Sequence, residues 1–153
     1  MVRRKLLLGC IAVVALSWAD PSDAGSDAIA VIVNKANPVG PLSQENLRPI
    51  YLMTKTVWSN GVAVEPFNLP DGTPMRTAFD GAVLGMNPDE VARYWIDRRI
   101  RGDARPPRKV PSPGTVLSLV AKSEGAIGYV PLADVNATVK VIARVEGGQV
   151  KAP

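Results

Sequence analysis

Residues 28–34 have the sequence AIAVIVN, a short apolar run rich in β-branched side chains that ends at a polar residue. It lacks the alternation of apolar and polar residues that is typical of a strand with one solvent-exposed face. A strand that is apolar throughout is buried on both faces, which is typical of parallel sheets covered by helices. The run therefore predicts a central strand of an α/β fold.

Two helices are clearly signalled after the loop at residues 68–72. Thr73 is suited to cap the first helix, and Pro74 to be its first residue. Asn87 is suited to cap the second helix, and Glu90, three residues later, completes a capping-box pattern. These signals predict two helices in close succession.

The remaining elements follow from the same kinds of signal: a short helix after Ser43 that contains Pro49, a helix from Ser112, and strands at 62–67, 126–130 and 139–145. The tail from residue 146 to residue 153 is expected to fray. Strands and helices alternate, and parallel strands need helical crossovers. We therefore predict a three-layer α/β sandwich with a small, mostly parallel sheet, formed as a single domain by residues 25–153.

Residues 1–24 have the pattern of a secretory signal peptide. Basic residues occupy positions 3–5, and an apolar run at 6–16 is short for a membrane span. Small residues precede Gly25, so we expect cleavage before it, with cleavage after Ala19 as the alternative. The protein is then periplasmic, and its connection with the membrane is through export alone.

Two other interpretations of this segment stay open. The residues before Cys10 resemble a lipoprotein cleavage site, although the apolar run continues beyond that cysteine. An uncleaved segment would instead anchor the chain in the membrane.

The composition excludes several kinds of chemistry. The 153 residues include 18 Lys or Arg and 14 Asp or Glu, which gives a net charge of +4, and they include no His. Cys10 is the only cysteine and lies in the predicted signal peptide. Without His or a mature Cys, there is no imidazole base, no thiol nucleophile and no zinc site built on these ligands. We predict that the protein is not an enzyme and has no cofactor or metal site.

Four motifs occur in an order typical of one protein family: LSxxxLxxI at 42–50, WxxG at 58–61, DGTxxRxxF at 71–79 and EGAIGYV at 124–130. This order resembles the phosphate-binding proteins of ABC transporters, which have the type II periplasmic binding protein fold. The closer similarity is to short, domain-sized members of that group. The resemblance implies one lobe of that fold, a small oxyanion such as phosphate as ligand, and an ABC permease or another envelope protein as partner.

The second lobe of the full-length family supplies a ligand loop with the sequence DGSGT. Residues 71–75 have DGTPM at the matching positions, and Leu69 stands where an Arg usually precedes the Asp. The chain looks similar to this second lobe and its connecting strands, with the first lobe largely missing.

The loop at residues 71–76 has the physical features of an anion site. A glycine-containing turn that leads into a helix presents free N–H groups and the positive end of the helix dipole. Thr73 can add a hydroxyl group and Arg76 a charge, so the candidate ligand-binding residues are Asp71, Gly72, Thr73 and Arg76. The alternative is structural, with Thr73 as a helix cap and Arg76 as the ion-pair partner of Asp71.

Basic residues are concentrated between residues 98 and 113. Export argues against nucleic acid as a partner. The alternatives are a solvated helix end, or contact with anionic lipid, a polyanion or an acidic protein. Two functions thus stay open: an oxyanion-binding transport protein, or an interaction or structural protein that kept the fold and lost its ligand.

Overall fold

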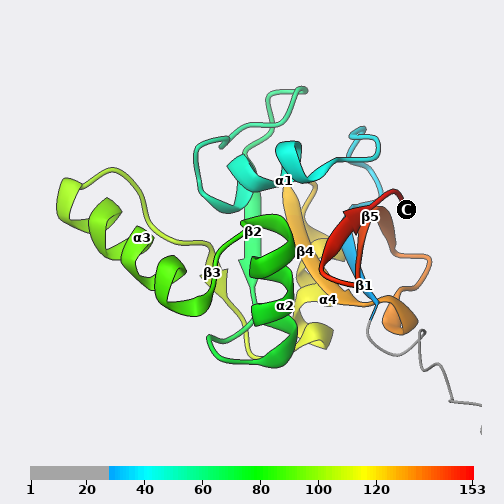
Figure 1. Cartoon of the computed structure of the whole chain (residues 1–153). Helices are drawn as coiled ribbons and strands as arrows, with labels where there is room; N and C mark the ends of the chain where they lie inside the picture. The colour runs from blue at the N-terminus through cyan, green and yellow to red at the C-terminus, as the bar shows by residue number, and fades with distance from the viewer. Residues whose placement is uncertain (1–27) are drawn as a thin grey trace, which may run out of the picture.

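The computed structural model describes residues 28–153, which form an α/β fold with one six-stranded sheet (Figure 1). In chain order, its elements are β1 (Ile29–Asn34), α1 (Gln44–Tyr51), β2 (Glu65–Asn68), α2 (Pro74–Val83), α3 (Pro88–Arg101), β3 (Arg108–Lys109), α4 (Pro113–Lys122), β4 (Ala126–Pro131), a 3-10 turn (Leu132–Asp134), β5 (Val139–Glu146) and β6 (Gln149–Lys151). The predicted signal peptide lies outside the described residues. Within residues 28–153, no helix combines the length and the apolar character that a membrane crossing needs.

The sheet is mixed, with the strand order β3-β2-β4-β1-β5-β6. β2 is parallel to β3 and to β4. β1 is antiparallel to β4 and to β5, and β5 is antiparallel to β6. The α/β class is confirmed, but the expectation of mostly parallel pairing is wrong. The apolar run of β1 indicates that the strand is buried on both faces. Burial alone does not determine whether the neighbouring strands are parallel or antiparallel to it.

The C-terminal tail is part of the sheet. β6 is an edge strand, and the hairpin that joins it to β5 turns through Gly147 and Gly148. Their φ angles are 58° and 74°, values that tight hairpin turns require and that glycine adopts without steric cost. The expectation that the tail frays from residue 146 is therefore wrong.

Helices cover both faces of the sheet, as two neighbouring residues of β4 show. Tyr129 stacks on Phe79 of α2, with 3.8 Å between the ring centroids. A Cβ atom added to Gly128 would lie 2.3 Å from Cγ1 of Val116 in α4. Because successive strand residues point to opposite faces, α2 and α4 lie on opposite sides of the sheet, as Figure 1 also shows. The predicted three-layer arrangement is confirmed.

The EGAIGYV sequence at residues 124–130 owes its residue types to packing. A Cβ atom on Gly125 would lie 2.0 Å from the carbonyl oxygen of Ala63, so the backbone approaches too closely for a side chain. The indole Nε1 of Trp58 donates to the carbonyl oxygen of Gly125 at 2.9 Å. Ala126 and Ile127 are fully buried. The motif places glycine where another segment comes close and apolar side chains elsewhere.

α3 begins with the predicted capping box and extends away from the sheet (Figure 1). The Asn87 side chain accepts from the Glu90 amide at 3.0 Å, and the Glu90 carboxylate accepts from the Asn87 amide at 2.8 Å. Val91 and Trp95 are the buried residues of this helix. The helix is thus attached to the body along one side and open on the other.

Candidate functional site

The candidate site lies on the loop between β2 and α2, residues 69–73, at the carboxyl end of β2. The side chain of Tyr129, in β4, is hydrogen-bonded to the residues at the start of this loop. Its hydroxyl accepts from the Leu69 amide at 3.2 Å and donates to Oδ1 of Asn68 at 3.1 Å. Burial raises the pKa of Tyr129 well above the ordinary tyrosine value, so the hydroxyl keeps its proton and remains a donor.

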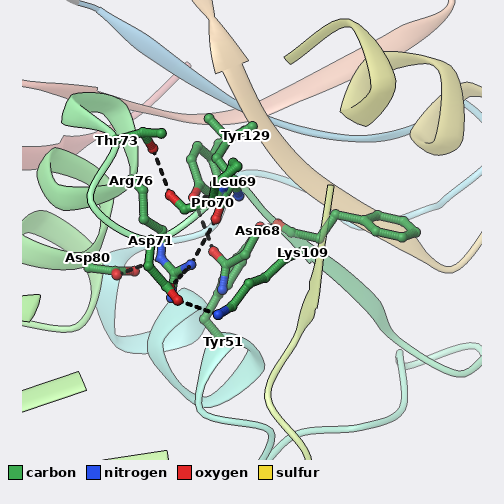
Figure 2. Close-up of polar contacts among 11 residues, drawn as sticks. Tyr51, Asn68, Leu69, Pro70, Asp71, Thr73, Arg76, Asp80, Lys109 and Tyr129 are labelled. Atoms are coloured by element: carbon green, nitrogen blue, oxygen red, sulfur yellow. Dashed lines mark hydrogen bonds and ion pairs between the residues drawn. The ribbon is translucent and has the colours of Figure 1, made fainter. Parts of the chain in front are cut away.

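Arg76 is a buried cation whose hydrogen bonds stay within the chain (Figure 2). Its Nε donates to Oδ2 of Asp80 at 2.7 Å. Its Nη1 donates to the Leu69 carbonyl oxygen at 2.9 Å and to Oδ1 of Asp71 at 3.0 Å. The Asp71–Arg76 ion pair that the sequence offered as an alternative is present, and the guanidinium braces the loop against α2.

Asp80 completes this buried group, and the sequence analysis missed it. Its Oδ1 atom has no hydrogen-bond partner among the described residues. Burial raises the pKa of Asp80, and the charge of Arg76 opposes that rise. The only sequence signal for the residue was its spacing of four positions from Arg76 within one helix.

Asp71 forms the exposed side of the site. Its side chain is 65% exposed and makes a second ion pair, with Nζ of Lys109. Lys109 belongs to β3, where it lies opposite Asn68 in the parallel pairing with β2. This pairing brings it beside the loop from 38 positions along the chain. Gly72 follows with a φ of +79°, a left-handed conformation that suits glycine.

Thr73 occupies the cap position of α2, but its hydroxyl does not cap the helix. The hydroxyl donates to the carbonyl oxygen of Pro70 at 2.9 Å and so closes the loop on itself. Pro74 takes the first helical position and has no N–H to offer. The expectation of a side-chain cap at Thr73 is therefore wrong in this detail.

A polar pocket of about 310 Å³ lies beside the loop, between it, α3 and β3. Asp71, Gly72 and Arg76 line it, together with Asp80 and with residues that the sequence did not assign to the site, chiefly Arg99 and Lys109. Three cations therefore face two carboxylates. This balance favours a small anion, provided that the ligand competes with the ion pairs already formed.

An apolar pocket of about 630 Å³ lies on the other side of the loop. Thr73 is part of its lining, with Pro70, Pro74, Met75 and Pro113. Pro74 and Pro113 are the first residues of α2 and α4. Because proline has no backbone N–H, each helix lacks one amide donor at the end that borders this pocket. The four predicted site residues are thus divided between two pockets, three at the polar one and Thr73 at the apolar one.

The described residues offer no obvious metal site. Within residues 28–153, no group of three or more His, Cys, Asp or Glu side chains could hold a metal ion. The chemistry that the site can supply is charge attraction and hydrogen bonding from Arg99, Lys109 and the loop.

The fold is that of the substrate-binding proteins of phosphate ABC transporters. One similar structure is an ABC-type phosphate transport receptor from Vibrio cholerae, with a TM-score of 0.60 and 23% identity over 76% of this chain. Another, from Clostridium perfringens, is described as a phosphate ABC transporter substrate-binding protein with bound phosphate. It has a TM-score of 0.61 and 26% identity over 76% of this chain. The expected resemblance to a lobe of this fold is confirmed.

The chain spans just under half of these proteins, 47% of the first and 46% of the second. No family model matches the sequence, and no curated protein matches it. The likeness therefore concerns the solute-binding fold of one part of the longer proteins.

Proposed function

We propose that the protein is an exported, single-lobe protein of the solute-binding type that binds a small oxyanion, with phosphate as the first candidate. The observation that carries the proposal is the polar pocket, where Arg76, Arg99 and Lys109 gather beside the Asp71-Gly72 turn. In sequence, Asp71 and Gly72 resemble the first two residues of the DGSGT ligand loop of the phosphate-binding proteins. The bound phosphate of the Clostridium perfringens protein supports the choice of anion.

Lys109 and Arg99 are the cations that a ligand can reach. The exposed pair between Lys109 and Asp71 contributes about 0–1 kcal/mol, so an anion can replace Asp71 on Lys109 at small cost. Arg76 is different because its Nε and Nη1 atoms are held by Leu69 and two carboxylates, which leaves only Nη2 without a hydrogen-bond partner among the described residues. In this proposal, Arg76 positions Asp71 through Nη1 and has only Nη2 to offer to the anion.

The proposed affinity is low, because a single lobe leaves one side of the ligand in water. An exposed helix start contributes only about 0.3–1 kcal/mol toward an anion. Micromolar binding needs roughly 8 kcal/mol. We therefore expect millimolar binding by the protein alone. Tighter binding needs a second surface, supplied by an ABC permease, another envelope protein or a second copy.

Isothermal titration calorimetry of the mature protein with phosphate and with sulfate tests the proposal. We expect saturable heat with at least one of these anions and its loss in Lys109→Ala. The matched control is Lys55→Ala, which removes the same charge from an exposed position outside the pocket lining. Heats equal to those of buffer dilution at anion concentrations well above the millimolar range would overturn anion binding.

A second candidate function is a periplasmic interaction or structural protein that kept the fold and lost ligand binding. The internal pairing of Arg76 and the apolar pocket beside Thr73 favour it. It predicts no anion heat but a defined partner, recovered from envelope extract by the wild-type protein. Substituting Met75→Asp in the apolar pocket should abolish that recovery, whereas Lys55→Ala should not.

Export is tested separately, by intact mass measurement of the protein recovered from the periplasm. Cleavage of the predicted signal peptide gives a chain that begins at Gly25, and the alternative site gives one that begins at Asp20. Recovery of the uncleaved chain in the membrane fraction would contradict the proposal.

A further inference from the structure

The positive charge of the described chain is concentrated in one segment, residues 93–109, which comprises most of α3 and the loop that leads through β3. This basic segment has seven Arg or Lys residues and two Asp residues. The rest of residues 28–153 has eight Arg or Lys residues against nine Asp or Glu residues. The molecule is thus strongly basic at one place and nearly neutral elsewhere.

The same helix exposes large apolar side chains. Ile96 is 52% exposed and Ile100 is 79% exposed, and their spacing of four positions puts them on one side of α3. Among the described residues, the other exposed large apolar side chain is Val57, at 48%. Val91 and Trp95, which are buried, hold the opposite side of the helix against the body.

Arg93 is exposed and precedes Ile96 and Ile100 by three and seven positions, so it lies on the same side of the helix. Ile96 also borders the polar pocket, so Arg93 and Ile100 form the part of this outer face that lies outside it.

This face is carried on a projecting ridge. Figure 1 shows α3 extending away from the sheet and the other helices. With 14 residues, the helix is about 21 Å long. A convex ridge of this kind can approach a flat surface without any matching cavity.

We infer that the outer face of α3 binds a lipid surface rich in anionic headgroups. Arginine side chains keep their charged ends at the headgroup level, while their stems and the two isoleucines enter the boundary below it. Each basic residue near an anionic membrane adds to the attraction. Arg93 and Ile100 thus put charge and exposed apolar surface on the same side of α3, and Arg101 and Arg105 add charge at its C-terminal end.

Two other occupants fit this face less well. A second copy would bring two strongly basic segments together, which like-charge repulsion opposes. An acidic protein would need about 800 Å² of complementary surface on each partner, and a single projecting helix offers little shape for that. A lipid surface requires charge and apolar side chains without shape complementarity.

The inference does not depend on anion binding in the polar pocket. Arg93, Ile100 and Arg101 are exposed residues of α3 and lie outside the pocket lining. Substitutions at these positions should therefore leave any phosphate heat unchanged, so the two proposals can fail separately.

Co-sedimentation of the exported protein with vesicles tests the inference. We expect binding to phosphatidylcholine vesicles that contain phosphatidylglycerol, no binding to pure phosphatidylcholine, and release by salt. The double variant Arg93→Ser, Arg101→Ser should bind roughly tenfold more weakly or worse. Ile100→Ser keeps every charge and should also bind more weakly, because its apolar contact is lost.

Lys55→Ala and Val57→Ser are the matched controls, since they remove one exposed charge and one exposed apolar side chain from another part of the surface. Both should bind like the wild type, and circular dichroism should show that all variants are folded. Equal binding to anionic and neutral vesicles, or full binding by Ile100→Ser, would overturn the inference. Capture on immobilised polyglutamate without any vesicle binding would also overturn it, in favour of an acidic protein.

Discussion

Arg76 and Lys109 pair with the same carboxylate, Arg76 at Oδ1 of Asp71 and Lys109 at Oδ2, and the two cations differ in their burial and in their other partners. The Arg76 side chain is 6% exposed and shares its donors with Asp80 and the Leu69 carbonyl oxygen. The Lys109 side chain is 51% exposed, and Asp71 is its one ion-pair partner among the described residues. The inner cation is part of the fold, whereas the outer cation can exchange its partner.

This difference separates the structural half of the site from the half that we propose binds the anion. Breaking a buried charge network leaves a charge without solvent or partner, which is strongly destabilising. Breaking an exposed ion pair returns both groups to water at little cost. Substitutions on the inner half should therefore change stability, and substitutions on the outer half should change ligand binding.

The largest expected effect is that of Arg76→Ala. It leaves Asp80 buried without its cation and removes a donor from the Leu69 carbonyl oxygen, so we expect a loss of about 3–5 kcal/mol in the free energy of unfolding. Urea denaturation measures this loss. Arg48→Ala, at an exposed position of α1, is the control and should stay within about 0.5 kcal/mol of wild type. A loss no larger than that of the control would show that the inner network is not structural.

Gly128→Ala should have the next largest effect, in the strand beneath the loop. The added methyl group would meet Cγ1 of Val116 at 2.3 Å, and overpacking of this kind costs about 1–3 kcal/mol. Gly81→Ala in α2 is the matched control, because a Cβ atom there meets nothing within 4 Å. It should stabilise the protein by roughly 0.5–1 kcal/mol through helix propensity. Thermal unfolding that changes in the same direction for both variants would contradict the packing argument.

Asp80→Asn should change how stability depends on pH. Burial raises the pKa of Asp80 above its ordinary value of 3.8, so the folded state binds this proton more tightly than the unfolded state does. The stability that Asp80 contributes is then complete below 3.8 and is lost as pH rises through the higher pKa of the folded state.

Urea denaturation of both proteins from about pH 4 to about pH 8 measures this contribution. The free energy of unfolding of the wild type, relative to Asp80→Asn, should fall as pH rises. A difference that grows with pH would mean that the attraction of Arg76 outweighs the burial of Asp80.

The smallest expected effect on stability is that of Lys109→Ala. Its ion pair with Asp71 is exposed at both ends, so the free energy of unfolding should change by no more than about 1 kcal/mol. The same variant should lose the heat of anion binding. Loss of folding in place of loss of binding would remove the distinction between the inner and outer cations.

Local signals in the sequence were sufficient for much of the fold. The capping box at Asn87 and Glu90 marked the start of α3, and the apolar run at residues 126–130 marked a strand. Strand direction was not available in this way, because β1 is equally apolar whether its neighbours run parallel or antiparallel to it. Pairing is decided by residues that are distant in sequence.

In the site, too, contacts between residues close in sequence could be predicted, and contacts between distant residues could not. Asp71 and Arg76 are five positions apart, and the sequence offered their ion pair as an alternative to anion binding. Lys109 reaches Asp71 only because β3 pairs with β2, and no local pattern shows that pairing. The turn of the Thr73 hydroxyl toward Pro70 depends on the shape of the folded loop, which residue type does not determine.

The burial of two indole rings allows the sheet and α3 to be followed separately by tryptophan fluorescence. Trp58 and Trp95 are the tryptophans of the described residues, and both are buried. Trp58 is fixed to the Gly125 carbonyl oxygen beside the sheet, whereas Trp95 lies in α3. In Trp58→Phe the fluorescence of Trp95 reports on the attachment of α3, and in Trp95→Phe that of Trp58 reports on the sheet. A red shift of Trp95 emission alone would therefore reveal α3 detaching while the rest of the protein stays folded.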